Sequence, residues 1–220
     1  MTQAHYDEGV IKFRCAHRTL PLGEKALETF APINAWREIF MRLGIVGADP
    51  GRYGGAGFGN LSARLPPFPG ERHKRRFVIT GTQTAKARDF GARHLCVIES
   101  YELKENAVAS SGPVEPSSES MTHGTLYNLN PNIRYVFHAH APLIWQRAGE
   151  MRLPTTNPKV AYGTPEMAFE AARLYRESDL SERRIMAMGG HEDGIITFGR
   201  NAAEAGNTMV DALARALEMG

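Results

Sequence analysis

The sequence between residues 58 and 108 contains a group of short strand-like runs with no helical pattern among them. The runs are Phe58–Leu65, Phe77–Thr80, Leu95–Glu99 and Glu102–Val108. Helical patterns come before and after this group. Strands that follow one another in this way are typical of a mainly antiparallel sheet covered by helices, and not of a doubly wound parallel sheet.

Helical periodicity is clearest from Glu24 to Leu43, where apolar residues recur at steps of three and four until Gly44 ends the pattern. Pro32 predicts either a kink or a break near the start of this helix. Further helices are expected over Ser117–Leu129, Thr164–Glu177 and Asn201–Glu218, and further strands over Ile133–His138, Ile185–Met188 and Gly194–Phe198. The first 20 residues have no clear period and are expected to form an arm or a short helix.

Length and composition favour one globular domain. The chain has 220 residues, of which 42% are hydrophobic and 23% are charged, and its formal net charge is +2. A balance of this kind argues against disorder and against a nucleic-acid partner.

No apolar run is long enough to span a membrane, and the N-terminus lacks the pattern of a secretory signal. Cys15 and Cys96 form no disulfide framework, so we expect a cytoplasmic domain. No repeat or linker divides residues 1–220, and residues 1–23 are expected to form the arm.

The most specific short pattern is Phe137-His138-Ala139-His140. In a strand, His138 and His140 point to the same face of the sheet. Two neutral imidazoles on one face can begin a site for a divalent transition metal. The alternative is two ordinary polar residues of a strand.

A second pattern is Glu115-Pro116-Ser117-Ser118-Glu119, which predicts a helix start with Ser117 as N-cap. The exposed N–H groups and the two hydroxyls suit a phosphate or a carboxylate, although the pattern also fits a plain cap. Glu119 falls in the first turn. If the following strand returns beside this helix, its carboxylate can serve the two histidines as a ligand or as a general acid/base.

Three glycine-containing turns complete the set of candidates. Gly57–Arg64 lets the backbone approach a ligand closely and brings the Asn60 amide near it. Thr80 and Gly81 begin a polar turn that can form a nest of N–H donors. His191 lies in the turn Met188–Gly194, where it is a metal ligand only if the fold returns it to the other two histidines.

Taken in order, these pieces resemble the class II aldolase/adducin family. The matching residues are Gly59–Arg64, Thr80-Gly81, Ser117-Ser118-Glu119, His123, Tyr127, His138-Ala139-His140 and His191. The resemblance extends from about Trp36 to Leu217. It implies a single three-layer α/β/α domain with a central, mainly antiparallel sheet, and a homotetramer with sites between neighbouring subunits.

The resemblance also implies a role for each site residue. His138, His140 and His191 would hold Zn²⁺ or another divalent transition metal. Asn60, Thr80, Gly81, Ser117 and Ser118 would bind a substrate phosphate. Glu119 would be the acid/base, and His123 would have a structural role. The family's assisting tyrosine from a neighbouring subunit has Tyr162 as its candidate here.

The implied reaction is retro-aldol cleavage of a small phosphorylated or carboxylated hydroxy-ketone through a metal-stabilised enediolate. Glu119 favours an aldehyde-lyase, because the family's sugar-phosphate epimerases typically have aspartate there. The alternatives are an epimerase, a dehydratase, a decarboxylase and a non-catalytic adducin-like assembly protein.

Glu192 and Asp193 depart from the family pattern, and can add a ligand, repel an anion or simply lie in a loop. The basic run at residues 72–76 is expected to be a solvated loop.

Overall fold

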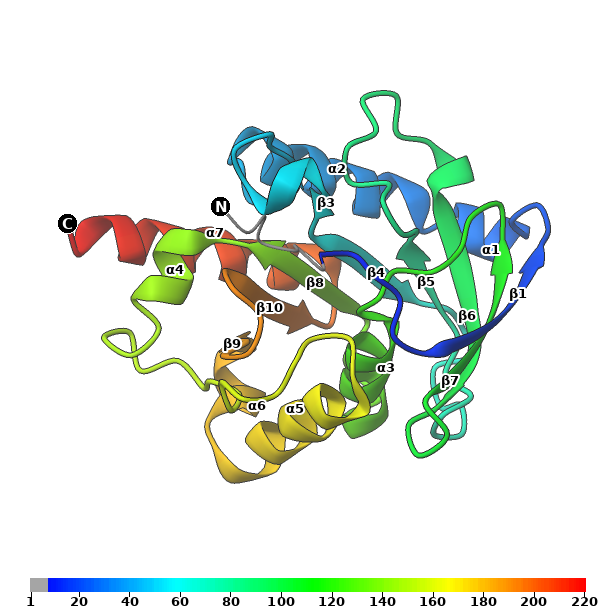
Figure 1. The fold of residues 1–220 in the computed structure, drawn as a ribbon. Helices are drawn as coiled ribbons and strands as arrows, with labels where there is room; N and C mark the ends of the chain where they lie inside the picture. The colour runs from blue at the N-terminus through cyan, green and yellow to red at the C-terminus, as the bar shows by residue number, and fades with distance from the viewer. Residues whose placement is uncertain (1–7) are drawn as a thin grey trace, which may run out of the picture.

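The computed structural model describes residues 8–220 as eight strands of one large sheet, flanked by helices (Figure 1). The large-sheet strands are β1 (Arg14–Thr19), β4 (Asn60–Arg64), β5 (Phe77–Thr80), β6 (Leu95–Glu102), β7 (Ala107–Gly112), β8 (Tyr135–His140), β9 (Ile185–Ala187) and β10 (Gly194–Gly199). The α-helices are α1 (Glu24–Leu27), α2 (Phe30–Arg42), α3 (Ser120–Leu129), α4 (Pro142–Gln146), α5 (Pro165–Glu177), α6 (Leu180–Arg183) and α7 (Ala202–Glu218). Two short 3-10 helices (Tyr53–Gly55 and Ala92–His94) and the small pair β2 (Gly47–Ala48) and β3 (Gly57–Phe58) complete the elements.

The large sheet has the order β1-β7-β6-β5-β4-β8-β10-β9. Every neighbouring pair is antiparallel except β1 and β7, which are parallel. The predicted mainly antiparallel sheet is therefore confirmed. Strand β8 is an interior strand of the sheet, with Asn60 of β4 opposite His138 on one side and Ile196 of β10 opposite it on the other.

Helices cover both faces of this sheet, which confirms the three-layer α/β/α architecture. One apolar cluster joins α2, α4 and α7 to one face, through residues such as Phe40, Ile144 and Met209. A second cluster joins α3, α5 and α6 to the other face, through residues such as Met121 and Met167. Figure 1 shows α2 and α7 on one side of the sheet and α3, α5 and α6 on the other. Alternate strand residues supply both clusters because side chains of a strand alternate between its faces.

Two expectations about strands are corrected. Residues 14–19, expected to lie in an arm or short helix, form the edge strand β1. The expected strand Glu102–Val108 is instead the end of β6, a turn closed by Asn106 (φ +48°) and the start of β7. Strand β1 pairs through its backbone and stays largely exposed, so its side chains carry no apolar alternation. Residues 1–7 of the expected arm lie outside the described residues.

Helix boundaries follow local hydrogen bonds. The expected helix Glu24–Leu43 is divided into α1 and α2 at Thr29, whose hydroxyl donates to the carbonyl of Ala26 (2.7 Å). Pro32 lies in the first turn of α2 and therefore marks the break and not a kink. At the other end, Gly44 adopts a left-handed conformation (φ +70°), as a C-terminal glycine does. The hydroxyl of Thr164 caps α5 by accepting from Met167 N–H (3.3 Å).

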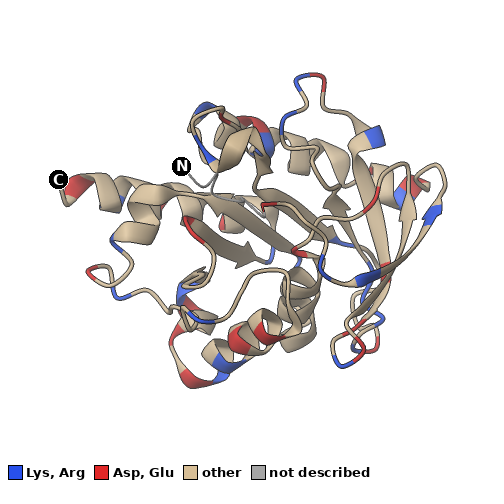
Figure 2. Cartoon of the chain, viewed as in Figure 1, with Lys and Arg blue, Asp and Glu red and all other residues tan. Residues whose placement is uncertain are grey.

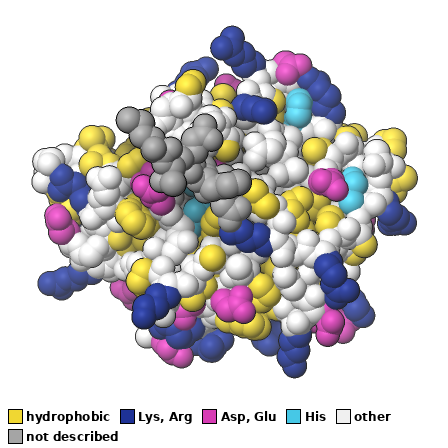
Figure 3. Space-filling model, in the orientation of Figure 1, with side chains coloured by type: hydrophobic (Ala, Val, Ile, Leu, Met, Phe, Trp, Pro, Cys, Tyr) yellow, Lys and Arg dark blue, Asp and Glu magenta, His cyan; other side chains and the backbone are white. Residues whose placement is uncertain are grey.

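Charged residues of both signs are interspersed over loops and helices (Figure 2). The face drawn in Figure 3 likewise mixes basic and acidic side chains and shows no continuous basic band. The basic run at residues 72–76 is partly tied down, because Arg75 donates to the carbonyl oxygens of Gly70 and Tyr127, and Arg76 pairs with Glu99. Within residues 8–220, no helix is both long enough and apolar enough to cross a membrane.

Candidate metal centre

Three histidines from two regions of the sheet meet in one cluster. His138 and His140 project from the same face of β8, with ring centroids 5.0 Å apart. His191, in the turn between β9 and β10, has its ring 5.0 Å from that of His138 and 4.7 Å from that of His140. One ring nitrogen from each lies within 4.8 Å of the others. The antiparallel pairing of β8 with β10 places Gly194 opposite His140, which brings the preceding turn back to the HxH pair.

Burial keeps these imidazoles neutral. It lowers the pKa of His138 to about 3, with His191 adding to the shift, and the pKa of His191 to about 4. Burial lowers the pKa of His140 well below its usual value. Nδ1 of His138 donates to the carbonyl of Ile195 (3.2 Å), which leaves the lone pair on Nε2. Neutral imidazole is the form that binds a metal.

Glu119 faces this cluster from the start of α3. One of its oxygens, Oε1, lies 3.9 Å from Nδ1 of His191, and the residue is only 1% exposed. Burial raises the pKa of the carboxyl group, and the positive charge that His191 can carry opposes this shift. The helix begins at Ser120, so Glu119 is its N-cap residue, and the expectation of Ser117 as N-cap is corrected.

A small polar cavity adjoins the cluster. Four of the five predicted phosphate-binding residues line it, namely Asn60, Gly81, Ser117 and Ser118, together with Thr82 and Gln83. Thr80 is not among its lining residues, because its buried hydroxyl accepts a hydrogen bond from the N–H of Leu61 (3.2 Å). Gly59 (φ +78°) lets the chain turn into β4 just before Asn60, and a Cβ there would lie 2.6 Å from Val46 Cγ2.

The turn after β5 does not offer the expected nest of N–H donors at its start. The N–H of Gly81 donates to the carbonyl of His94 (2.8 Å), and that of Thr82 donates to the carbonyl of Glu115 (3.0 Å). The second bond, together with the bridge between Gly81 and Pro116, holds the turn against residues 115–116, which lead to the two serines. A Cβ on Gly81 would lie 2.3 Å from Val114 Cγ1, so glycine is needed for this close approach.

His123 and Tyr127 belong to a buried network beneath the site. The hydroxyl of Ser62 lies 2.7 Å from Nδ1 of His123 and 2.7 Å from the hydroxyl of Tyr127. It also donates to the carbonyl of Val136 (3.3 Å). This network ties α3 to β4 and β8. The position of His123 agrees with the structural role that the family resemblance implied.

The remaining candidates lie around His191. The ring of Tyr162 stacks on His191 of its own chain, with centroids 4.2 Å apart, and Lys12 Nζ lies over the Tyr162 ring at 3.8 Å from its centroid. The carboxylate of Asp193 has partners outside the cluster, because it accepts from the Tyr53 hydroxyl and pairs with Arg52. Glu192 is exposed. The structure thus brings Tyr162 to the cluster and leaves Glu192 and Asp193 outside it.

One residue of the site is absent from the sequence-based candidates. Glu8 places Oε2 2.9 Å from Nε2 of His191 and Oε1 3.5 Å from Nε2 of His140. The segment before β1 has no periodicity or motif, so nothing in the sequence indicates that it returns to the sheet centre.

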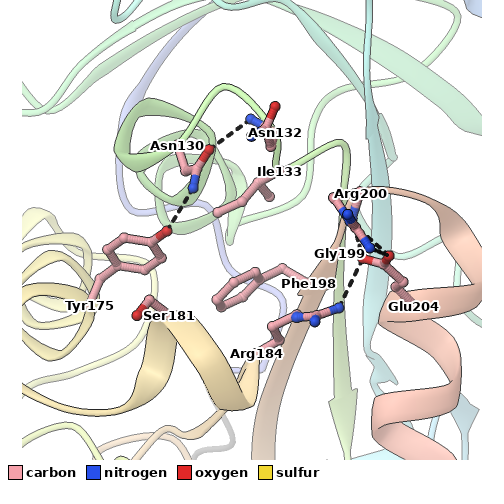
Figure 4. A pocket seen from close by; sticks show the side chains of 10 residues that line it. All are labelled: Asn130, Asn132, Ile133, Tyr175, Ser181, Arg184, Phe198, Gly199, Arg200 and Glu204. Atoms are coloured by element: carbon pink, nitrogen blue, oxygen red, sulfur yellow. Dashed lines mark hydrogen bonds and ion pairs between the residues drawn. The ribbon is translucent and has the colours of Figure 1, made fainter.

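A separate cavity lies near the far end of β10, between α6 and α7 (Figure 4). Its two guanidinium groups, from Arg184 and Arg200, both bind the carboxylate of Glu204. The Glu204 carboxylate compensates one of these two positive charges, and no histidine lines this cavity. The histidine cluster is therefore the stronger candidate for chemistry.

The donor set fits a divalent transition metal. Nε2 of His138 and both oxygens of Glu119 are buried and make no hydrogen bond with any residue from 8 to 220. Buried polar atoms of this kind are normally satisfied, so several in one cluster indicate a ligand. Nitrogen donors from three imidazoles beside a carboxylate suit Zn²⁺ and related ions.

Comparison with known proteins agrees with this geometry. Residues 52–219 match the sequence model of the class II aldolase and adducin N-terminal domain. No match was found among curated proteins.

Solved structures with a similar fold include several aldolases. An L-fuculose-1-phosphate aldolase from Thermus thermophilus is 22% identical, with 86% of this chain and 91% of that chain covered and a TM-score of 0.59. A sugar-phosphate aldolase from Thermotoga maritima is 17% identical, with 85% and 96% covered and a TM-score of 0.57. A Klebsiella pneumoniae protein described as a candidate aldolase, epimerase or decarboxylase is 18% identical, with 90% of each chain covered and a TM-score of 0.61. At these identities the likeness shows the fold.

Proposed function

Because the chain belongs to the class II aldolase and adducin family, we propose that it is a metal-dependent aldehyde-lyase. Its substrate would be a small hydroxy-ketone or sugar phosphate, cleaved by a retro-aldol reaction. The observation that carries this proposal is the buried cluster of three neutral histidines with Glu119 3.9 Å from His191.

His138, His140 and His191 would hold the metal, which we propose to be Zn²⁺ or another divalent transition ion. When bound, the ion supplies a Lewis acid that takes up negative charge developing on substrate oxygens. In retro-aldol cleavage, the hydroxyl on the carbon that becomes the aldehyde loses its proton, the C–C bond next to that carbon breaks, and the carbon left on the other fragment is protonated. Glu119 is suited to move one of these protons, because burial raises the pKa of its carboxyl group toward working pH. Tyr162, stacked on His191, is the candidate for assisting at the hydroxyl oxygen that becomes the aldehyde oxygen.

The polar cavity would fix the substrate's anionic end. Asn60, Ser117 and Ser118 offer side-chain donors, and Gly81 supplies the close backbone approach. Thr80 would contribute indirectly, by holding the backbone of β4 next to Asn60, because its hydroxyl accepts a hydrogen bond from Leu61 N–H. Holding the distal group this way spends binding free energy on orienting the reacting carbons.

An epimerase, dehydratase or decarboxylase reaction is the second candidate, since a similar fold is described for a protein with several candidate activities. A non-catalytic adducin-like role is less favoured, because the three histidines and Glu119 are all present and together. We also propose a homotetramer with sites near subunit boundaries and a cytoplasmic location, from the family resemblance and the two free cysteines.

The experiment is a screen of ketose 1-phosphates and related hydroxy acids against metal-loaded protein, with product aldehyde measured. The double variant His138→Ala/His140→Ala should lose both bound metal and activity, whereas His17→Ala, which alters a histidine on β1, should keep both. Cleavage that persists without the two histidines would contradict the proposed mechanism. Light scattering of the purified protein tests the tetramer.

A further inference from the structure

The segment before β1 brings a fifth side chain of metal-ligand type to the histidine cluster. Glu8 Oε2 lies 2.9 Å from His191 Nε2, and Glu8 Oε1 lies 3.5 Å from His140 Nε2. The side chain is 11% exposed, so this is not a solvated surface carboxylate. The dark-blue chain that carries it crosses the middle of the sheet before reaching β1 (Figure 1).

These separations match those of two ligands on one ion. With metal–ligand distances of about 2.0–2.1 Å and tetrahedral angles, neighbouring donor atoms lie roughly 3.3 Å apart. The carboxylate of Glu8 stands within about that range of two of the three imidazoles. It therefore stands where a fourth donor atom would complete the set.

The backbone holds Glu8 at this place. The hydroxyl of Thr82 donates to the carbonyl of Gly9 (3.1 Å), and the amide of Gln83 donates to the carbonyl of Glu8 (3.4 Å). Gly9 adopts a left-handed conformation (φ +75°), and a Cβ there would lie 2.2 Å from the Gln83 amide nitrogen. Farther along, Asn106 Nδ2 donates to the carbonyl of Lys12 (2.9 Å). The segment is thus fastened at Glu8 and Gly9 and again at Lys12.

Charge balance gives a reason for a carboxylate here. Three neutral imidazoles leave the double charge of a divalent ion uncompensated, and burying such charge is costly unless it is paired. Glu119 also faces the cluster, but it approaches His191 from the opposite ring nitrogen, Nδ1, at 3.9 Å. Among residues 8–220, Glu8 is the carboxylate that lies within 4 Å of two of the three histidines.

We propose that Glu8 is a fourth protein ligand of the metal ion held by His138, His140 and His191. This inference rests on the proposed function only for the existence of that metal site. It assigns to the N-terminal segment a part in metal binding that the family motifs, which begin at about residue 52, do not include.

The test is a competition titration of Zn²⁺ between a chromophoric chelator and the metal-free protein, for wild type and Glu8→Gln. Loss of one ligand should weaken affinity by at least the 10- to 100-fold typical of losing an outer-shell partner of a metal site. Glu192→Gln is the matched control, because it removes an exposed carboxylate next to His191 that makes no contact with the cluster. A second readout is the visible spectrum of Co²⁺-substituted protein, which should change with Glu8→Gln and not with Glu192→Gln.

The outcomes separate this inference from the proposed function. If His138→Ala weakens Zn²⁺ binding and Glu8→Gln leaves affinity and the Co²⁺ spectrum unchanged, Glu8 is not a ligand and the inference fails alone. If Glu119→Gln weakens binding while Glu8→Gln does not, Glu119 is the carboxylate ligand and the inference also fails. If His138→Ala leaves affinity unchanged, the metal site itself is wrong. Melting temperatures of the metal-free variants check that each one folds.

Discussion

The carboxylate of Glu119 lies 3.9 Å from Nδ1 of His191, so the start of α3 and the turn between β9 and β10 meet at one point. Local structure alone does not bring Glu119 and His191 together. The two come together because β8 pairs with both β4 and β10, and α3 packs beneath these strands. This contact links the candidate acid/base to the candidate metal ligands.

Glu119→Gln should keep the fold and the metal but reduce turnover by roughly 10²- to 10⁴-fold, the usual contribution of a positioned proton-transfer group. The amide preserves the shape of the carboxyl group and cannot exchange a proton. Rates on the substrate found by the screen, together with metal content, measure this. Full activity in the variant would remove Glu119 from the mechanism, and loss of metal would make it a resting-state ligand.

Local chemistry explains which parts of this site could be predicted from the sequence. The two-residue period of a strand places His138 and His140 on one face wherever that strand lies. The glycine after α2 is likewise a short-range signal, and the structure confirms that the helix ends there. The order of the motifs then supplied the family and its three-layer fold.

Long-range pairing explains what could not be predicted. Strand β1 joins the sheet by parallel backbone hydrogen bonds to β7. The side chains of residues 14–19 show no pattern from which this pairing could be predicted. Glu8 reaches the histidines because the segment before β1 crosses strands that are distant from it in sequence. The N–H groups of Gly81 and Thr82 were expected to face a ligand, but carbonyls of His94 and Glu115 accept them. Each miss concerns a partner distant in sequence.

Ser62→Ala should lower the free energy of unfolding by about 1–3 kcal/mol, because it leaves buried polar groups of His123 and Tyr127 without their shared partner. Urea unfolding followed by circular dichroism measures this. Zinc affinity should change little, since the network lies beneath the cluster and not in it. A large loss of affinity with unchanged stability would show that the Ser62 network acts on the metal site.

The metal-free protein should lose stability as the pH falls below about 6.5. His123, His138, His140 and His191 all have pKa values lowered by burial, so each takes up a proton on unfolding in the window between its folded and unfolded pKa. For His191 and His138 this window extends down to about 4 and about 3. Each proton contributes about 1.4 kcal/mol per pH unit.

Glu119 acts in the opposite direction on this pH dependence. Its raised pKa means that the folded state binds a proton before the unfolded state does, which offsets part of the loss while the carboxyl group titrates. Because four imidazoles oppose one carboxyl group, stability should still fall with decreasing pH. Urea unfolding between pH 7 and pH 5 measures the slope, and His123→Gln should reduce it. A flat profile would contradict the neutral, buried state of the cluster.

Inorganic phosphate should stabilise the metal-free protein against heat, and two substitutions should change this effect in opposite directions. Ser118→Ala removes a hydroxyl that lines the polar cavity, so the increase in melting temperature at a fixed phosphate concentration should shrink. Glu8→Gln removes a negative charge from the lining of the same cavity, so the increase should grow. Glu192→Gln, which removes an exposed carboxylate outside the cavity, is the control for general charge. If all three variants respond like wild type, phosphate does not bind in this cavity, and the substrate's anionic group must be held elsewhere.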